Sequence, residues 1–278
     1  MKNLVYIGLF FVLLFPLAAV GSQECVILLH GLARVSNSMS ELETKLNRSG
    51  YSAISINYPS RKYAIDVLAS DAVGRGISEC AGVDTIHFVT HSLGGILVRY
   101  YLENSIIENL GRVVMLGPPN QGSEIVNGML GVPGFKVFGG PTGIALGSGE
   151  GHIPDSLGPV EFDLGVIAGN TNINPLGLLF IRGENDSIVS VESTKVEGMN
   201  AHLVLPVTHT FMMRNKEVIM SKIKNYMMDI EEFCDGYFYG GDSEFTVDEV
   251  AADADKYFRS TMAGDYARQY LETQLGEM

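Results

Sequence analysis

The chain has 278 residues, 46% of them hydrophobic, which is enough apolar material for one large core. Its 19 basic and 32 acidic residues give a formal net charge of -13. The length and hydrophobic fraction lead us to expect one globular domain. A negative field of this kind repels phosphate backbones and anionic lipid headgroups, so we expect no nucleic-acid partner.

The first 21 residues have the pattern of a signal peptide. Lys2 supplies a positive start, residues 4–20 carry no charge, and residues 19–21 suit cleavage. An uncleaved N-terminal membrane anchor is the alternative, because an apolar run of this length is at the lower limit for spanning a bilayer. The predicted core begins at Val26, so an anchor would hold the folded domain hard against the lipid. We therefore expect cleavage and export, either to a periplasm or by secretion.

From residue 26 onward, short apolar runs alternate with helical patterns. This alternation is typical of a mostly parallel sheet with helices on both faces, the α/β class. Strands are predicted at residues 26–29, 52–57, 85–89 and 112–116. Helices are predicted between them at residues 38–48, 65–77 and 96–102. The first run is too short and too uniformly apolar for an amphipathic helix, which favours a buried strand.

The alternation breaks at residues 118–160, where glycines crowd in and apolar residues follow no steady period. A long irregular segment inside a compact domain is usually functional, so we expect a lid or a pocket wall. A passive glycine-rich excursion is the alternative. Strands are predicted again at residues 164–168 and 202–207, followed by a helix at 211–228. The domain is expected to span residues 22–233.

The last part of the chain, residues 234–278, changes composition. It is acidic, carries no recognisable motif and ends in one or two predicted helices. We expect a helical tail that forms a surface appendage, and an arm that docks a partner is the alternative.

Export would permit disulfides, and the chain has three cysteines, Cys25, Cys80 and Cys234. Cys25 and Cys80 each lie shortly before a predicted strand, so they can form a disulfide if those two strands are parallel neighbours. Three separate thiols or a metal ligand remain open from the sequence. No Cys-x-x-Cys pair supports a zinc site.

The strongest functional signal is Thr90-His91-Ser92-Leu93-Gly94-Gly95, between a predicted strand and a predicted helix. A serine on such a sharp turn projects its hydroxyl from the sheet, and small neighbours let the chain bend. We therefore predict that Ser92 is a nucleophile.

A serine nucleophile needs a base that removes its proton. Of the six histidines, only His209 follows the exit end of a late strand, where the active-site loops of parallel sheets gather. His91 adjoins the serine but is expected to point elsewhere, and His202 lies at the entry end of the last strand. We predict that His209 is the general base.

A third group should hold the other nitrogen of the histidine and stabilise the imidazolium. Asp186 lies in the turn-rich segment 183–189, which gives the chain order serine, acid, histidine. Glu184 and Asp163 are weaker candidates, and a plain turn-forming role is the alternative for Asp186. We predict Asp186 as the orienting acid.

An oxyanion hole needs backbone donors aimed at the developing charge. The amide of Leu93, next after the nucleophile, is one candidate donor. The other is the amide of Leu32, in the loop after the first strand, where Gly31 permits close approach. A plain turn at His30-Gly31 is the alternative.

Together these residues resemble the bacterial lipase and esterase branch of the α/β-hydrolase superfamily. The resemblance covers residues 26–228 and rests on His30-Gly31-Leu32, His91-Ser92-Leu93-Gly94-Gly95, Gly117-Pro118-Pro119-Asn120-Gln121-Gly122-Ser123, Asp186 and His209. It implies an α/β-hydrolase fold and hydrolysis of a carboxylic ester through an acyl-enzyme, without metal or organic cofactor. The partner would be a small-molecule or lipid ester, and the insertion could contact a membrane surface.

The chain departs from the family pattern in two places. Family members usually have glycine two residues before the serine, where this chain has Thr90. The strand that ends at His30 begins almost at the expected mature terminus, so we predict a minimal version of the fold that lacks the first strands.

Other functions are compatible with the same residues. A thioesterase, an amidase or an acyltransferase would use the same triad. A catalytically inactive hydrolase fold that serves in binding is an alternative from a different class.

Overall fold

The computed structural model describes residues 23–132, 134–215, 218 and 223. The predicted signal peptide at 1–21, the tail at 234–278 and Cys234 lie outside the described residues. Most of the helix predicted at 211–228 lies outside them too.

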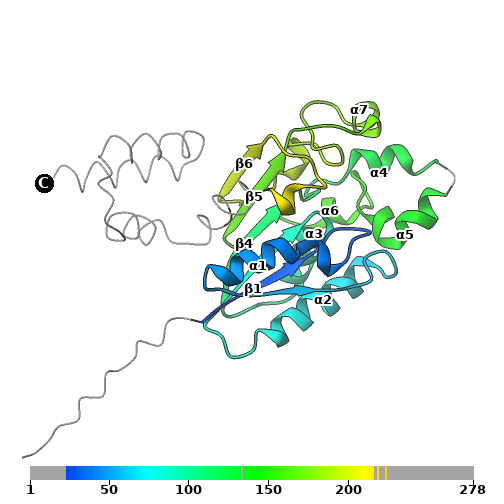
Figure 1. The fold of residues 1–278 in the computed structure, drawn as a ribbon. Helices are drawn as coiled ribbons and strands as arrows, with labels where there is room; N and C mark the ends of the chain where they lie inside the picture. Colours follow the sequence, from blue (N-terminus) through cyan, green and yellow to red (C-terminus); the bar gives the residue numbers. More distant parts are fainter. Residues whose placement is uncertain (1–22, 133, 216–217, 219–222, 224–278) are drawn as a thin grey trace, which may run out of the picture.

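Six strands form one sheet, and every neighbouring pair runs parallel (Figure 1). The strand order is β2-β1-β3-β4-β5-β6. The bounds are β1 (Glu24–Leu29), β2 (Ser52–Ile56), β3 (Thr85–His91), β4 (Leu110–Leu116), β5 (Leu164–Gly169) and β6 (Ala201–Leu205). The prediction of a parallel sheet at these six places is confirmed.

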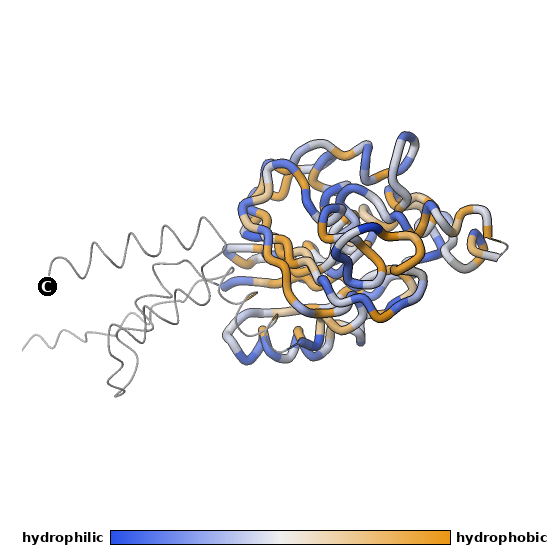
Figure 2. Tube along the Cα trace, turned by 90° about the horizontal axis from the view of Figure 1, so that it is seen from above, coloured by the Kyte–Doolittle hydropathy of each residue, from blue (hydrophilic) through white to orange (hydrophobic). Residues whose placement is uncertain are grey.

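The sheet divides the core into two halves, and helices cover each face. On one face, Val26 and Leu28 pack with side chains of the 3₁₀ helix η1 (Ser36–Met39) and the helix α1 (Ser40–Arg48). On the other face, Ile27 and Leu29 pack against α2 (Ile65–Glu79) and α3 (Leu93–Asn104). Successive side chains of a strand point to opposite faces, so a strand covered on both sides is mostly apolar. Figure 2 shows this, with hydrophobic stretches of chain running through the middle of the domain.

The helix α2 shows why glycines inside a helical pattern do not exclude a helix. A Cβ atom at Gly76 would lie 2.6 Å from Cγ2 of Ile27. Glycine therefore lets the helix pack directly on β1, and the helix continues past its predicted end to Glu79.

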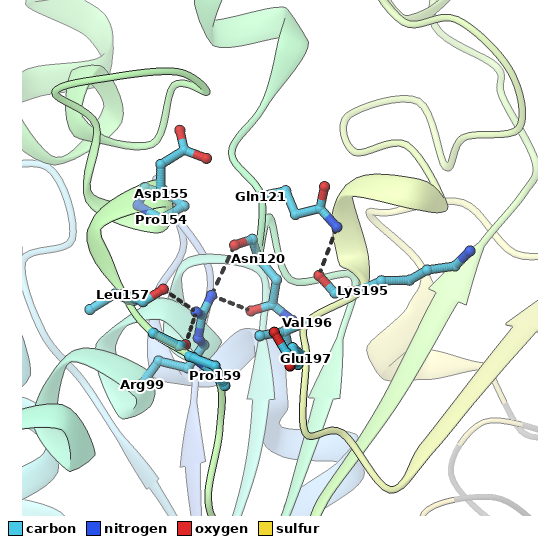
Figure 3. A pocket seen from close by; sticks show the side chains of 11 residues that line it. Arg99, Asn120, Gln121, Pro154, Asp155, Leu157, Pro159, Lys195, Val196 and Glu197 are labelled. Atoms are coloured by element: carbon cyan, nitrogen blue, oxygen red, sulfur yellow. Dashed lines mark hydrogen bonds between the residues drawn. The ribbon is translucent and has the colours of Figure 1, made fainter.

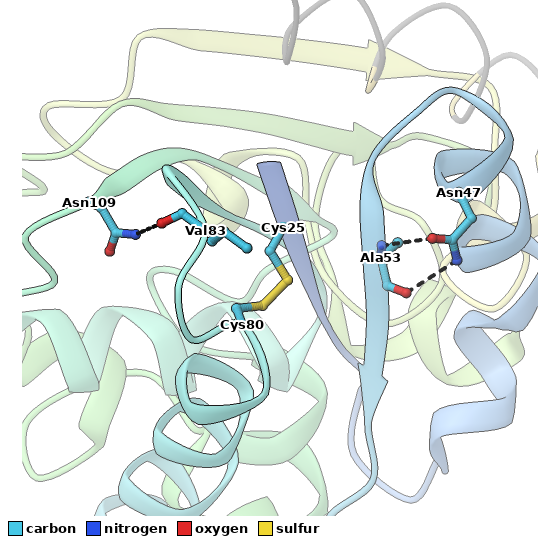
Figure 4. The surroundings of a disulfide bond; sticks show 6 residues. All are labelled: Cys25, Asn47, Ala53, Cys80, Val83 and Asn109. Carbon is cyan, nitrogen blue, oxygen red and sulfur yellow. Dashed lines mark hydrogen bonds between the residues drawn. A yellow bond between two sulfur atoms is a disulfide. The ribbon is translucent and has the colours of Figure 1, made fainter. Parts of the chain in front are cut away.

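A disulfide joins Cys25 on β1 to Cys80 (Figure 4). The strands β1 and β3 are parallel neighbours, as the predicted pairing requires. Cys80 is the C-cap of α2 and lies one turn of chain before β3, with its Cα atom 5.9 Å from that of Cys25. The bond ties the end of α2 to the start of β1.

The segment predicted to be irregular, 118–160, contains three short helices. They are α4 (Glu124–Met129), α5 (Phe135–Ala145) and α6 (Ile153–Ser156). Gly140, with φ 64°, interrupts α5 directly before Pro141. This break scrambles the helical period of the apolar residues, which is why the sequence pattern did not reveal the helix.

Three further short helices complete the described part of the chain. They are α7 (Pro175–Phe180) and the 3₁₀ helices η2 (Glu192–Thr194) and η3 (Met212–Arg214). At the start of the helix predicted at 211–228, residues 212–214 form the 3₁₀ helix η3. No helix among the described residues is long and apolar enough to cross a membrane.

Candidate active site

The predicted nucleophile, Ser92, lies in the turn between β3 and α3 with φ 52° and ψ -118°. This backbone conformation is strained for a residue with a side chain, and such strain is typical of functional turns. The Ser92 amide donates to the carbonyl of Leu116 at the end of β4 (2.9 Å). A Cβ atom at Gly94 would lie 2.6 Å from the carbonyl oxygen of Leu29, so only glycine lets α3 start this close to β1.

Thr90, which departs from the family pattern, lies in the regular part of β3. Its side chain is fully buried, and its hydroxyl contacts the carbonyl oxygen of Val114 at 3.5 Å. The positive φ falls on Ser92 itself, so a β-branched residue at 90 sits in an extended backbone that suits it.

The predicted acid and base are in direct contact. Nδ1 of His209 lies 2.7 Å from Oδ2 of Asp186, whose side chain is fully buried. Oδ1 of Asp186 accepts hydrogen bonds from the amides of Ile188 (3.0 Å) and Val189 (2.8 Å). A carboxylate only accepts hydrogen bonds, so Nδ1 of His209 carries the hydrogen and Nε2 is free to take a proton.

The end of β4 brings the serine and the acid–base pair to one place. The amide of Ser92 is hydrogen-bonded to the carbonyl of Leu116. The next residue, Gly117, lies against the side chains of Asp186 and His209. A Cβ atom at Gly117, where φ is 54°, would lie 2.9 Å from Oδ2 of Asp186 and 3.0 Å from Nδ1 of His209. The three predicted residues therefore gather at the carboxyl edge of the sheet.

The loop after β1 approaches the nucleophile closely. A Cβ atom at Gly31 would lie 3.2 Å from Cβ of Ser92, so glycine is required for this approach. Leu32, the proposed donor, follows directly. Leu93 is the first residue of α3, and the first amides of a helix have no partner within the helix and favour negative charge.

Tyr58 and Ser60, which were not predicted to belong to the site, hold this loop. The ring of His30 stacks on that of Tyr58 at 4.0 Å between centroids, and the Tyr58 hydroxyl donates to the carbonyl of His30. Oγ of Ser60 accepts a hydrogen bond from the amide of Ala33 (3.0 Å). Burial lowers the pKa of His30, which keeps the stacked ring neutral. Tyr58 and Ser60 follow the exit end of β2, which is the one sequence signal that could have found them.

Three residues that were not chosen as base or acid are His202, Asp163 and His91. Nε2 of His202 lies 2.8 Å from Oγ1 of Thr194, at the entry end of β6 and away from the site. Asp163 forms an ion pair with Arg112 at the entry end of β5. The expectation that His91 points away from the site is wrong: its ring lies 4.6 Å from that of His209, between centroids.

The insertion packs against loops that border the site. Ser92 and His209 are each only 7% exposed. The helix α5 reaches the loop after β2, where the Thr142 hydroxyl donates to the carbonyl of Tyr63 (2.5 Å). A Cβ atom at Gly143 would lie 3.2 Å from Cδ2 of Leu32, so α5 also touches the loop that carries the proposed oxyanion donor.

Arg99 of α3 clamps both ends of the insertion (Figure 3). Its buried guanidinium donates to the carbonyl of Asn120 (2.9 Å) at the start of the insertion and to those of Leu157 (3.2 Å) and Gly158 (3.0 Å) near its end. Burial lowers the pKa of Arg99 to about 10, although it remains charged at neutral pH. The side-chain amide of Asn120 continues the network to the carbonyl of Thr194 (2.8 Å).

A cavity of about 260 Å³ adjoins this clamp, and Figure 3 shows the side chains around it. Its lining includes Gln121, Asp155, Lys195 and Glu197 but neither Ser92 nor His209. We therefore do not assign it to the acyl group. Within the described part of the chain, no group of three or more His, Cys, Asp or Glu residues is arranged to hold a metal ion.

No protein-family model and no curated protein matches the chain. Solved structures do. The mature form of the lipase BlEst2 from Bacillus licheniformis is 18% identical, with a TM-score of 0.58, over 75% of this chain and 94% of that one. A thermophilic esterase from Thermogutta terrifontis is 13% identical, with a TM-score of 0.52, over 74% and 90%. Phospholipase PlaB from Legionella pneumophila is 16% identical, with a TM-score of 0.54, over 87% and 65%. Identities this low establish the architecture alone, and the chain has the α/β-hydrolase fold found in bacterial lipases and esterases.

Proposed function

We propose that the protein is a serine hydrolase that cleaves carboxylic esters through an acyl-enzyme on Ser92. The observation that carries the proposal is the 2.7 Å contact between His209 and the buried Asp186. This contact lies at the end of β4, where the amide of Ser92 is hydrogen-bonded to the carbonyl of Leu116. The fold similarity to lipases and esterases supports the same reaction class.

In the proposed reaction, Oγ of Ser92 attacks the carbonyl carbon of the ester while Nε2 of His209 takes the hydroxyl proton. Asp186 stabilises the imidazolium that forms. The amides of Leu32 and Leu93 would bind the negative oxygen of the tetrahedral intermediate. His209 then gives its proton to the leaving alcohol. A water molecule attacks the acyl group in the same way, which releases the acid and restores the free hydroxyl.

Hydrolysis of a short p-nitrophenyl ester tests this proposal. We expect Ser92→Ala and His209→Ala each to lower kcat by roughly 10³-fold or more, because each removes a reacting group. The double variant should lose little beyond either single one, since the triad acts as a unit. Retained activity in correctly folded Ser92→Ala would contradict the assignment. Normal activity in His209→Ala, together with a loss in His202→Ala, would move the base to His202.

We further propose that the substrate is lipid-like, because large apolar side chains are exposed on segments that leave the edge of the sheet at which the site lies. In the described chain they lie almost entirely on segments that follow the carboxyl ends of strands; only Ile106 lies at the opposite edge. The residues at the carboxyl edge are Val35, Tyr63, Val67, Val132, Val137, Ile173, Leu178, Leu179 and Phe211. Scattered exposed apolar residues are normal, but a set gathered at one edge is typical of an interaction surface. We call this set the apolar rim.

The apolar rim and the covered nucleophile together suggest how substrate reaches Ser92. A lipid surface would contact the rim, and the insertion at 118–160 would act as a lid that moves aside. The net charge of -13 favours zwitterionic or uncharged lipid over anionic lipid.

Export of the protein is also part of the proposal. The disulfide between Cys25 and Cys80 supports it, since such bonds persist mainly in oxidising compartments. The signal-peptide pattern of residues 1–21 gives independent support from the sequence.

A further inference from the structure

His91, the residue directly before Ser92, takes no part in the mechanism proposed above, yet it is one of the most buried polar side chains in the described chain, with 2% of its surface exposed. Its Nε2 lies 2.9 Å from the backbone carbonyl oxygen of His209. The two imidazole rings are in contact, tilted by 50°. The side chain therefore bridges the strand that carries the nucleophile and the loop that carries the base.

The chemistry of this contact fixes the protonation state of His91. A carbonyl oxygen can only accept, so Nε2 must carry the hydrogen. Nδ1 is buried and has no hydrogen-bond partner. A second hydrogen on Nδ1 would be an unpaired buried donor on a charged ring, which is costly. His91 is therefore the neutral tautomer with hydrogen on Nε2.

The groups around His91 favour the same state. Burial is the largest effect that holds its pKa well below the usual value, and positive charge on His209, Arg34 or His30 acts in the same direction. On its other side, Nδ1 lies against the loop after β1, where a Cβ atom at Gly31 would be 2.7 Å away. His91 thus lies between the loop of the proposed oxyanion hole and the loop of the base.

The hydrogen bonds of His209 show what this bridge accomplishes. The carboxylate of Asp186 contacts the ring of His209. The backbone carbonyl of Asp186 accepts a hydrogen bond from the backbone amide of His209 (2.9 Å). Both residues lie on loops that follow β5 and β6, so these two bonds fix the acid and the base relative to each other. The bond from His91 joins that pair to β3, the strand that ends at the nucleophile.

We propose that His91 is a positioning residue: its Nε2–H group holds the carbonyl of His209 and so sets the distance between the base and Ser92. The inference rests on the proposed hydrolase function. Misplacement of a catalytic group by about 1 Å can cost about 100-fold in rate, which is the scale of effect expected if this bridge is lost.

Two variants separate positioning from packing. His91→Phe keeps a flat ring but removes the donor, and we expect kcat to fall about 10- to 100-fold with KM changed by less than about 3-fold. His91→Gln places a side-chain N–H where Nε2 was, so it should recover most of the lost kcat. The pH profile of kcat/KM should shift in His91→Phe, because the environment of His209 changes, and return toward that of the wild type in His91→Gln.

A spectroscopic measurement keeps the test independent of activity. In ¹⁵N-labelled wild-type protein at neutral pH, two-bond imidazole correlations should show His91 as the neutral Nε2–H tautomer, and the His209 signals should move in His91→Phe. A charged or Nδ1–H ring at His91 would overturn the inference, and so would a folded His91→Phe with wild-type kcat and pH profile. If the wild type shows the expected tautomer but hydrolyses no ester, the proposed function is wrong, while the hydrogen bond from His91 to His209 is supported. If His91→Phe does not fold, the inference is tested by the tautomer of His91 in the wild type and by kcat of His91→Gln, where a charged or Nδ1–H ring or a large loss of kcat would overturn it.

Discussion

The carboxyl edge and the amino edge of the sheet are built from different kinds of contact. The amino edge contains the disulfide between Cys25 and Cys80 and, separately, the ion pair of Arg112 with Asp163 (3.1 Å). Nδ2 of Asn109 also donates to the carbonyl of Val83 there (3.1 Å), as Figure 4 shows. These contacts tie the starts of strands to one another and to α2.

The carboxyl edge instead holds strained backbone and buried polar groups. The residues other than glycine that have positive φ in the described chain are Ala33, Ser92 and Ser187, and all three follow strand ends at this edge. Strain and buried polar groups lower stability unless other contacts compensate. The amino edge stabilises the fold, while the carboxyl edge holds the residues of the proposed reaction. Changes at the two edges should therefore separate stability from turnover.

Loss of the disulfide should produce the largest change in stability. We expect Cys25→Ser with Cys80→Ser to lower the free energy of unfolding by about 2–5 kcal/mol. Because the bond lies at the amino edge, kcat at a temperature where the variant stays folded should match that of the wild type. Chemical denaturation and ester hydrolysis measure the two effects. A large fall in kcat in the folded variant would show that the two edges are not separate.

Alanine at Gly117 should reduce turnover strongly. The added Cβ atom would press on Asp186 and His209, and φ of 54° is unfavourable for alanine. We expect kcat to fall about 10- to 100-fold, as for other small displacements of catalytic groups.

Gly82→Ala is the matched control. Gly82 has φ 86° at the amino edge, with no atom within 4 Å of an added Cβ. It should lose about 1 kcal/mol of stability through backbone strain and keep its kcat. Equal losses of kcat in both variants would mean that strain alone, rather than contact with the site, explains the effect.

Polar substitution in the apolar rim should have the smallest effect. Val137→Ser with Leu178→Ser changes side chains that are 89% and 76% exposed, so stability should change by less than about 0.5 kcal/mol. Activity on an emulsified long-chain ester should fall several-fold, while activity on a soluble short ester should not change. Ile106→Ser, at a side chain 91% exposed on the opposite edge, is the control and should affect neither. An equal loss with Ile106→Ser would remove the reason to assign the rim to lipid contact.

The parts of the fold that were predictable depend on short stretches of sequence. The six strands were predicted from short runs rich in apolar residues, of which β1, β3 and β5 are buried almost throughout. Ser92 was predicted as the nucleophile because its turn follows one of these runs. Asp186 and His209 were predicted as acid and base from their order along the chain, since parallel strands bring their ends to one edge. The structure places both where that argument expects them, in contact with each other.

The parts that were missed depend on contacts between distant segments. Gly140 and Pro141 break the period of α5, so no single helical pattern spans it. The orientation of His91 is set by the carbonyl of His209, which lies 118 residues away. The stacking of His30 on Tyr58 likewise joins two strands that only the folded sheet makes neighbours. Local propensity carries no information on such pairs.

Covalent labelling of the purified protein with a fluorophosphonate tests the central claim most directly. We predict one adduct per chain, located by peptide mass spectrometry on Ser92, with none in Ser92→Ala and a strongly slowed reaction in His209→Ala. Folded wild-type protein that stays unlabelled, or that carries the adduct on a different residue, would contradict it.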